Sequence, residues 1–446
     1  MTGEMKHPRI RVIGAGLAGC EAAWQAARLG VFVDLYEMKP TKTTPAHHYN
    51  GFAELVCSNS LRSNDTHNAV GLLKSELRQL GSLIMEAADA SAVPAGSALA
   101  VDRYRFSDYI TEKIRSHPMI CVHEEEITLL ESEAITVVAT GPLTADGLAQ
   151  AIRERMQGGA LHFYDAAAPI VDASTINMEV AYFASRYGKG DPTDYLNCPM
   201  TEAEYDAFYQ ALVTAEEAVL KEFEREAGEK EPKVFEGCMP VEVMARRGYD
   251  TLRYGPMKPV GLPLPATGRE AYAVVQLRRE NREGSMYNLV GFQTHLTFPE
   301  QKRVFRMIPG LENAEFFRFG VMHRNTYLSS PGFLTPQYAT RTDPRLFFAG
   351  QITGVEGYVE STSSGYVAGY NAALLARGEE LLDFPSSTEI GALAHYVSES
   401  TVGDFQPMNA NFGIIAPLGY KVKGGKAARN AAYAERSLAV LREMLP

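Results

Sequence analysis

The sequence has few cysteines, and none is placed for a disulfide framework or a metal site. Only five occur in 446 residues, and they are widely scattered: Cys20, Cys57, Cys121, Cys198 and Cys238. The absence of a CxxC pair argues against a structural zinc site and a thioredoxin-type redox pair. The histidines form no HExxH-type motif, and the adjacent pair His47 and His48 is more typical of a loop. We predict no metal, and expect any reactive cysteine to act singly.

The chain also lacks a long apolar run. A membrane-spanning helix needs about 20 consecutive apolar residues, and no stretch approaches that length. No basic, apolar leader precedes Arg11. We therefore expect no membrane partner and a cytoplasmic location. With 46% apolar and 22% charged residues, the chain is expected to form a globular protein of two or three domains.

An overall excess of basic residues is absent, since the formal net charge is −11. Such a balance ordinarily argues against a nucleic-acid partner. However, residues 246–324 hold 13 Lys/Arg against 7 Asp/Glu, and residues 416–446 hold six against two. Because RNA binding depends on the face that meets the phosphates, these basic segments keep an RNA partner open. Dispersed, solvated charges are the alternative interpretation.

A dinucleotide-binding βαβ unit is predicted near the N-terminus. An apolar strand over 10–13 leads into GAGLAG, and a helix over 20–29 and a second strand follow. The first glycine permits a tight turn, the second lets a pyrophosphate approach the backbone, and the third lets the helix pack closely. The helix N-terminus then stabilises the phosphates. The predicted cofactor-binding residues of this loop are Gly14, Ala15, Gly16, Leu17, Ala18 and Gly19.

An acid closes the second strand of this unit. Glu37 lies 23 residues after Gly14, where a carboxylate is expected to bond the ribose hydroxyls of the adenosine. Its presence favours FAD or NAD over NADP. A glycine-rich turn of some other α/β protein is the alternative, because a lone GxGxxG is weak evidence. Here strand, helix, second strand and acid lie in register, so the pattern predicts a nucleotide cofactor.

Two later segments favour FAD. Buried strands over 135–141 and 345–350 both end in glycine, and a helix over 361–377 follows the second. This second segment resembles the one that contacts FAD in the glutathione-reductase-like flavoproteins, where the positive helix end stabilises the reduced flavin. No second GxGxxG occurs, so a separate NAD(P)H domain is not expected. The further predicted cofactor contacts are Thr140, Gly141, Gly350 and Gly357.

The composition changes after this first region, which indicates an inserted domain. A capping box at Thr201 and Glu204 begins a helix whose apolar face reaches Phe223. Strand-like runs broken by Gly and Pro then continue to Arg324. The expected fold class is α/β: a glutathione-reductase-like Rossmann FAD-binding domain with an inserted α+β domain. We place the two parts of the FAD-binding domain at 1–169 and 325–446, and the insertion at 170–324.

Within the first part, local patterns predict several further elements. Helices are expected over 69–80 and 106–116, the second closed by Pro118. Strands are expected over 119–123 and 127–130.

Two cysteines lie in segments suited to chemistry. Cys57 follows the second strand in a long polar loop, which can reach a flavin. Cys238 lies in a turn between a glycine and a proline, with Arg246 and Arg247 close by in sequence. Cationic neighbours lower the pKa of a thiol and favour the nucleophilic thiolate. A buried, inert thiol is the common alternative for a free cysteine.

The motifs taken together resemble one family. They are GAGLAG with YEMKP, NGFAELVCSNSLRS, FEGCMPVEVMARRG, LRYGPMKPVGL, FGVMHRNTYLSSP and LFFAGQITGVEGYVESTSSGYVAG. The sequence is similar to the folate- and FAD-dependent tRNA (uracil-5-)-methyltransferase family over residues 10 to beyond 369. Its long cysteine-centred motifs are far more specific than the GxGxxG.

The resemblance implies a reaction and roles for particular residues. A one-carbon unit would pass from 5,10-methylenetetrahydrofolate to carbon-5 of uridine-54 in the T-loop of tRNA, with FAD reduced by NADH or NADPH. Cys238 would be the nucleophile that adds to carbon-6, and Cys57 the general base beside the flavin. His323 would stack on the folate pterin, with a structural histidine as the alternative. Arg246 and Arg247 would contact RNA phosphates, unless they are solvated surface residues.

Other functions stay open at this point. A related flavoprotein of tRNA wobble-uridine modification shares the cofactor motifs, but resembles the chain less at the two cysteine segments. A folate- or NAD(P)H-dependent flavin oxidoreductase would act without RNA. An RNA-binding flavoprotein with a structural cofactor would not need Cys238. Because Cys238 lies in the inserted domain, we expect a conformational change when RNA binds.

Overall fold

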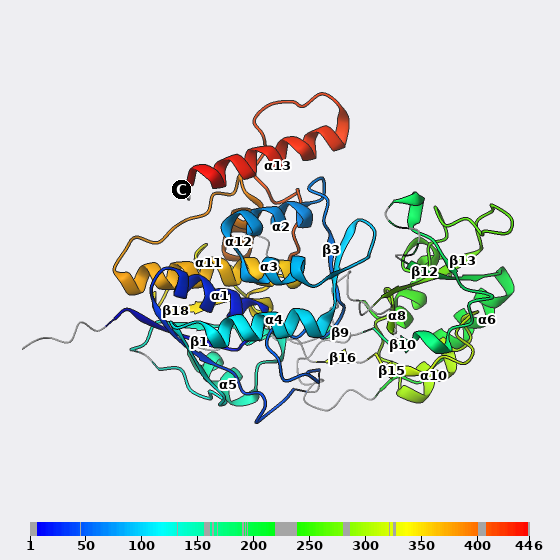
Figure 1. Ribbon diagram of the computed structural model, residues 1–446, viewed down its shortest axis with the longest axis horizontal. Helices are drawn as coiled ribbons and strands as arrows, with labels where there is room; N and C mark the ends of the chain where they lie inside the picture. Colours follow the sequence, from blue (N-terminus) through cyan, green and yellow to red (C-terminus); the bar gives the residue numbers. More distant parts are fainter. Residues whose placement is uncertain are drawn as a thin grey trace, which may run out of the picture.

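The computed structural model describes most of the chain. The described residues are 7–44, 46–131, 133–155, 161–162, 165–166, 168–189, 191, 193, 195–218, 239–279, 286–320, 322–323, 327–399 and 407–444. They form two lobes with separate hydrophobic cores, the first built from both ends of the chain and the second from its middle (Figure 1). No helix in these ranges is both long and apolar enough to cross a membrane.

A five-stranded parallel sheet lies at the centre of the first lobe. Its strands, in spatial order, are β18 (Leu346–Phe348), β7 (Thr136–Val138), β1 (Arg9–Ile13), β2 (Phe32–Tyr36) and β6 (Ile120–His123). Most of their residues are buried, which explains why they read as short apolar runs. Strand β18 pairs with β7, so the chain leaves this sheet, forms the second lobe and then returns to complete it.

Two helices cross in direct contact against this sheet. They are α1 (Leu17–Arg28) and α11 (Tyr358–Arg377), and glycines of α11 meet the backbone of α1. Each begins three residues before its predicted start. The prediction placed each start at the first strong helix formers, whereas each helix begins directly after a glycine N-cap, Gly16 or Gly357.

Among the described residues, six further helices and a small sheet belong to the first lobe. The helices are α2 (Ala69–Leu80), α3 (Leu83–Ala90), α4 (Arg103–Ser116), α5 (Asp146–Arg155), α12 (Glu389–Glu399) and α13 (Gly425–Met444). The small antiparallel sheet has the order β3 (Ser60–Ser63), β5 (Ala98–Val101) and β4 (Ala92–Val93). Short 3₁₀ helices in the two lobes are η1 (Gly141–Leu143), η2 (Ala173–Thr175), η3 (Arg186–Gly188) and η5 (Gln351–Thr353).

The local predictions for this lobe hold in part. Helix α2 has the predicted bounds. Helix α4 begins before the predicted residue 106, because the Asp102 carboxylate accepts the N–H groups of Tyr104 (3.1 Å) and Arg105 (3.2 Å). The predicted strand over 127–130 is wrong: these residues form no strand, and Ile127 lines a cavity instead.

The second lobe is built on a six-stranded antiparallel sheet. Its strands, in spatial order, are β11 (Tyr182–Phe183), β12 (Tyr195–Met200), β13 (Ala273–Arg279), β14 (Met286–Leu289), β10 (Ile170–Asp172) and β15 (Phe316–Arg318). Its described helices are α6 (Glu202–Val213), α8 (Val241–Arg246), α9 (Thr251–Tyr254) and α10 (Phe298–Phe305). Two short ladders pair the outgoing chain with the returning chain: β8 (Leu161–His162) with β17 (Tyr327–Leu328), and β9 (Asp165–Ala166) with β16 (Met322–His323).

Helix α6 begins as predicted and ends earlier. The capping box is present, since Glu204 accepts the Thr201 N–H (2.7 Å) and the Thr201 hydroxyl accepts the Glu204 N–H (3.4 Å). The prediction that this helix continues to Phe223 is wrong, because the helix ends at Val213. The Thr214 hydroxyl bonds back to the carbonyl of Gln210 (2.7 Å), and the chain then pairs with the segment around residue 296. Phe223 itself lies outside the described residues.

Buried carboxylates lie where α2, α11 and α12 meet. Glu76 of α2 accepts the N–H groups of Glu389 and Ile390 (2.8 Å each) and so caps α12. Burial raises the pKa of Glu76 to about 7. Burial, and then the neighbouring Glu76 and Glu360, also raise the pKa of Glu389 well above its usual range. These acids hold protons in the folded protein at pH values where the unfolded chain has lost them.

We expect Glu389→Gln to flatten the dependence of stability on pH. A raised pKa in the folded state means that stability is greatest below the unfolded pKa of about 4.3 and falls as pH rises through the folded pKa. The variant should therefore lose less stability than wild type between pH 5 and pH 8. Urea unfolding at both pH values measures this difference. The exposed Glu435→Gln on α13 is the control, and equal pH slopes for wild type and Glu389→Gln would refute the prediction.

Candidate active site

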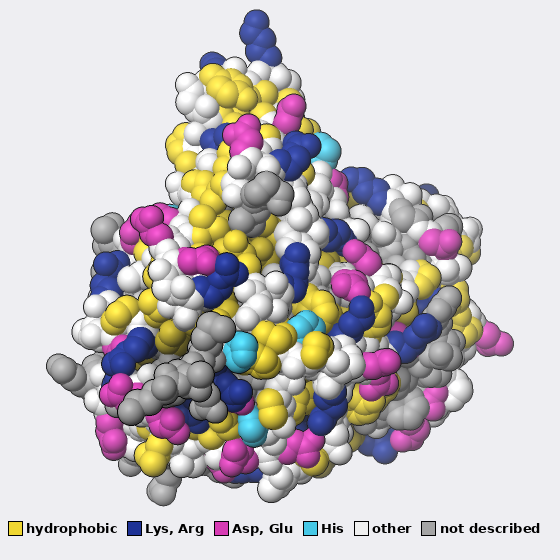
Figure 2. Space-filling view, turned by 60° about the vertical axis from the view of Figure 1, so that its left-hand side comes forward, with side chains coloured by type: hydrophobic (Ala, Val, Ile, Leu, Met, Phe, Trp, Pro, Cys, Tyr) yellow, Lys and Arg dark blue, Asp and Glu magenta, His cyan; other side chains and the backbone are white. Residues whose placement is uncertain are grey.

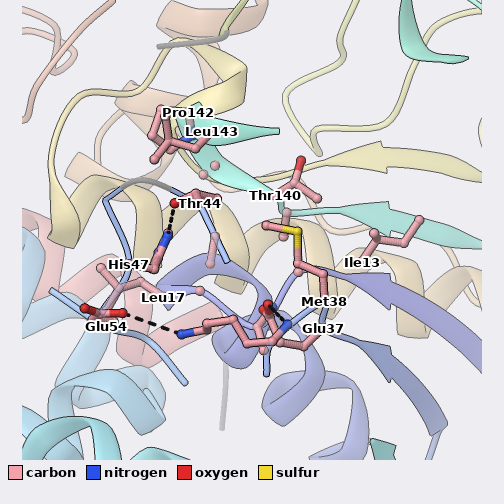
Figure 3. A pocket seen from close by; sticks show the side chains of 18 of the residues that line it. Ile13, Leu17, Glu37, Met38, Thr44, His47, Glu54, Thr140, Pro142 and Leu143 are labelled. Atoms are coloured by element: carbon pink, nitrogen blue, oxygen red, sulfur yellow. Dashed lines mark hydrogen bonds and ion pairs between the residues drawn. The ribbon is translucent and has the colours of Figure 1, made fainter. Parts of the chain in front are cut away.

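A cavity opens at the carboxyl ends of β1, β2 and β7 (Figure 3). In parallel α/β sheets, ligands bind at this edge. The predicted cofactor-binding residues that line it are Gly14, Ala15, Gly16, Leu17, Ala18, Glu37, Thr140, Gly141 and Gly350. Cys57 also lines it, together with the start of α11. Gly19 and Gly357 are not among the lining residues.

The glycine loop has the geometry of a phosphate site. Gly14 has a φ of 98°, and a Cβ there would lie 2.7 Å from the carbonyl oxygen of Ala139. Around Gly16 a Cβ would meet no atom within 4 Å, so a ligand can approach the bare backbone. Helix α1 has neither a capping side chain nor an acid in its first turn. Its first N–H groups are therefore suited to a pyrophosphate, and the loop fits a dinucleotide such as FAD.

Glu37 holds this loop and still has acceptor capacity. One carboxylate oxygen accepts the Ala15 N–H (2.8 Å), and the other accepts the Lys39 N–H (3.0 Å). Each oxygen of an ionised carboxylate has a second lone pair. Glu37 lines the cavity, so its remaining lone pairs suit the ribose hydroxyls that the sequence pattern predicts.

Lys39, which the sequence analysis did not single out, anchors the long loop between β2 and β3. Its buried ammonium donates to the carbonyls of Tyr49 (3.0 Å) and Gly51 (2.7 Å) and lies 3.7 Å from Glu54. Figure 3 shows Glu54 and His47 on the same side of the cavity. The His47 ring bonds the Thr44 hydroxyl (2.6 Å), and burial lowers the pKa of His47. These contacts fold the loop over the cavity.

The opposite wall comes from the C-terminal part of the chain. Gly350 has a φ of 83°, and its N–H donates to the Ser364 hydroxyl of α11 (2.7 Å). Gly357, the N-cap of α11, has a φ of 120°. The first turn of α11 carries a buried acid, Glu360, whose charge is met by an ion pair with Arg62. The N-terminal turn of α11 thus faces the cavity with its own acid already compensated.

Cys57 is held at the cavity wall by its backbone. Its N–H and that of Ser58 both donate to the hydroxyl of Tyr358, at 2.8 Å and 3.1 Å. Tyr358 is the first residue of α11, and burial raises its pKa. The tyrosine was not singled out from the sequence, because its partner loop lies about 300 residues away. It connects the predicted base to the helix whose first turn lines the cavity.

A side chain of the second lobe also reaches this loop. Arg278 of β13 is 8% exposed, and its guanidinium donates to the hydroxyl of Ser58 and to Asn59 Oδ1 (3.3 Å). In return, Asn59 Nδ2 donates to the carbonyl of Arg279 (2.6 Å). These buried bonds tie the inserted lobe to the residues directly after Cys57.

We expect Arg278→Met to loosen this connection. Methionine fills similar space but leaves the buried Asn59 Oδ1 without a donor, which costs about 1–3 kcal/mol. Urea unfolding should show this loss, and peptide-level mass spectrometry should show faster alkylation of Cys57 by iodoacetamide. Arg279→Met is the matched control, because that guanidinium donates to the Tyr287 hydroxyl (3.4 Å) and to neither Ser58 nor Asn59 among the described residues. Equal alkylation rates in both variants would contradict the prediction.

The other described cysteines have different environments. Burial raises the pKa of Cys20 well above its usual range, and raises that of Cys198 to about 12. Cys121 is exposed and lies with Asp34 and His123 in a group that could hold a metal ion. However, Asp34 already accepts two bonds from Arg9 (2.8 and 3.0 Å). Of the cysteines that the structure describes, Cys57 is the one that lines the cavity.

The structure describes the side chains of two of the remaining predicted site residues, Arg246 and Arg247. Cys238 lies outside the described residues, and for His323 the structure gives only the backbone, which pairs with Asp165 in a short ladder. Arg246 forms an ion pair with Glu217, so its charge is compensated. Arg247 is exposed at the end of α8.

The chain is similar to one known family and to several named relatives. The family model "Glucose inhibited division protein A" matches residues 9–380. A relative from Heliobacterium modesticaldum, named methylenetetrahydrofolate–tRNA-(uracil-5-)-methyltransferase TrmFO, is 61% identical over 98% of both chains. A relative of the same name from Acetivibrio thermocellus is 59% identical over 97% of this chain and 98% of its own.

Solved structures show the same fold. Aquifex aeolicus GidA in two crystal forms is 18% identical and superposes with TM-scores of 0.69 and 0.70. The match covers 98% of this chain and 73% and 76% of those chains. Together with the parallel sheet, this likeness confirms the predicted fold class.

Proposed function

The chain belongs to the family of methylenetetrahydrofolate–tRNA-(uracil-5-)-methyltransferases, within the broader Glucose inhibited division protein A family, and we propose that it methylates carbon-5 of uridine-54 in the T-loop of tRNA. The observation that carries the activity is 61% identity to a relative of that name over 98% of both chains. The glycine-lined cavity with Cys57 in its wall supports the same reaction.

The proposed chemistry needs two thiols. Carbon-5 of uracil becomes nucleophilic only after a thiolate adds to carbon-6, and the proton on carbon-5 must leave afterwards. We assign the first role to Cys238 and the second to Cys57. The loop that carries Cys57 is fixed by Tyr358 and Arg278, so its thiol would be presented at a defined point of the cavity. Bound FAD, once reduced by NADH or NADPH, would supply the electron pair that reduces the one-carbon unit of methylenetetrahydrofolate to a methyl group.

The remaining assignments follow from the same function. FAD would lie along Gly14 to Gly19, Glu37, Thr140, Gly141, Gly350 and Gly357. His323 would stack on the folate pterin, and Arg247 would contact RNA together with Arg246. We propose NADH or NADPH as the electron source and the cytoplasm, where tRNA is modified, as the location. We keep 1–169 with 325–446 as the cofactor domain and 170–324 as the insertion.

A label-transfer experiment tests the proposal. Purified protein is incubated with NADPH, methylene-labelled 5,10-methylenetetrahydrofolate and an unmodified tRNA transcript. Label recovered as 5-methyluridine at position 54, and lost in a transcript with cytidine there, is the expected result. Flavin reduction without label in the RNA would refute the proposal in favour of a small-molecule oxidoreductase. A product at the wobble uridine would refute it in favour of the wobble-modifying flavoprotein.

A further inference from the structure

A basic groove lies far from the cofactor cavity along the chain, on the N-terminal half of α13. Two adjoining hollows share Lys426, Arg429 and Tyr433 of this helix. The remaining walls come from the loop before α13, the segment 410–413 and the start of α2. We call this surface the basic groove. In Figure 1, α13 forms one edge of the molecule and its N-terminal end points to the side of the second lobe.

The groove is positively charged in a protein whose net charge is −11. Lys421, Lys426 and Arg429 are exposed and line it, and none of its described lining residues is acidic. Across the described ranges, no ion pair joins these three cations to a carboxylate. Figure 2 shows Lys and Arg side chains on the projecting part of the molecule that α13 and the loop before it form. Cations without acidic partners are available to an anionic ligand.

A buried amide supplies an observation of a different kind. Asn430 lines the groove and is only 6% exposed, and its Nδ2 donates to the His67 carbonyl (2.8 Å). Its Oδ1 has no hydrogen-bond partner among the described residues. A buried acceptor without a donor is rare in folded proteins. A ligand with a hydroxyl group beside its anionic group, such as a ribose phosphate, would satisfy both the amide and the cations.

Aromatic side chains flank the same surface. The Tyr433 ring stacks on Phe412 (5.6 Å between centroids), and the Arg436 guanidinium lies 5.3 Å from its centroid. Tyr420, in the loop that lines the groove, is 65% exposed. Exposed aromatic rings beside cations are typical of surfaces that bind nucleic acids.

We propose that the basic groove binds the ribose-phosphate backbone of the tRNA substrate. This inference rests on the proposed function and adds a contact surface separate from the cavity. Lys421, Lys426 and Arg429 would neutralise phosphates, and Asn430 would accept a ribose hydroxyl. The groove therefore holds the tRNA by its backbone while the target base is placed elsewhere. By contrast Arg246, singled out from the sequence, is already paired with Glu217.

The test compares two changes on one helix. Lys426→Gln/Arg429→Gln removes two charges from the groove, and Arg442→Gln removes an exposed charge at the other end of α13. The Kd for an unmodified tRNA transcript is measured at several salt concentrations with the full-length protein. We expect the double variant to bind about tenfold more weakly, with a slope of log K against log salt reduced by roughly 1.4–1.8. FAD content should stay unchanged, and the control should bind as wild type does.

Two results distinguish a failure of the groove proposal from a failure of the proposed function. If the double variant keeps the wild-type Kd and salt slope, the groove proposal is wrong even though methylation proceeds. If wild type gives no 5-methyluridine, the proposed function is wrong, whatever the groove binds. If the double variant loses FAD, Lys421→Glu takes its place, because that residue lies in the loop and not in the helix. An unchanged Kd in Lys421→Glu would also overturn the proposal.

Discussion

Gly365→Ala and Gly369→Ala are each expected to destabilise the protein and lower its FAD content. In the interior of an ordinary helix, replacing glycine by alanine stabilises by about 1 kcal/mol. Here a Cβ on Gly365 would lie 2.3 Å from the carbonyl oxygen of Ala18, and one on Gly369 would lie 2.3 Å from the Cα of Ala22. Both obstacles are backbone atoms of α1, so no side chain can turn away. These two substitutions should therefore lower the stability of the protein, whereas the same change in an ordinary helix raises it.

The expected size follows from what must move. Forcing an extra methyl group into a well-packed core typically costs about 1–3 kcal/mol, and occasionally more. Since α1 begins at the glycine loop, its displacement also disturbs the predicted pyrophosphate site. Urea unfolding and the FAD-to-protein absorbance ratio measure the two effects.

The control for these variants is Gly378→Ala, directly after α11. This glycine has a φ of 72°, but a Cβ there would meet no atom within 4 Å. We expect a loss of about 1 kcal/mol, the usual backbone cost at a left-handed position, with FAD content unchanged. A stabilised Gly365→Ala variant would show that α1 and α11 are not in the contact that the structure gives them.

The parts of the fold that could be predicted are those with local causes. The first βαβ unit and helix α2 have their turns, caps and apolar residues within a few positions of each other. Helix α13 illustrates the opposite case. Its buried residues are Asn430, Ala434, Ser437 and Leu441, so its inner face is mostly small or polar and gives a weak hydrophobic period. Such a face is recognised only when the surface that it covers is known.

The same distinction holds for the candidate site. The glycine loop could be predicted to bind a cofactor because consecutive residues define it. Lys39 and Tyr358 could not be singled out, since their importance comes from carbonyl and N–H partners supplied by folded loops. Arg278 is a surface-like residue in sequence but is buried by contact with the Cys57 loop. The roles of Cys57 and Cys238 came from the family resemblance and stay predictions.

Cys238→Ala is expected to abolish methyl transfer with FAD still bound, and Cys57→Ala to slow it strongly at a later step. Without a thiolate to add at carbon-6, carbon-5 of uracil has no enolate character and cannot attack the one-carbon unit. Loss of a general base commonly costs about 10²–10⁴ in rate, and loss of the nucleophile should leave no measurable transfer. The exposed Cys121→Ala is the control and should retain wild-type transfer.

The two roles can be separated with a tRNA that carries 5-fluorouridine at position 54. With 5,10-methylenetetrahydrofolate present, the thiolate can add to this base and carbon-5 can take the one-carbon unit. Carbon-5 then carries fluorine and has no proton to lose, so the covalent protein–RNA adduct should persist on a denaturing gel. We expect the adduct in wild type, in Cys121→Ala and in Cys57→Ala, and none in Cys238→Ala. An adduct that survives in Cys238→Ala but is lost in Cys57→Ala would exchange the two assignments. In that case the nucleophile would be Cys57, whose backbone N–H donates to the Tyr358 hydroxyl, and Cys238 of the insertion would be the base.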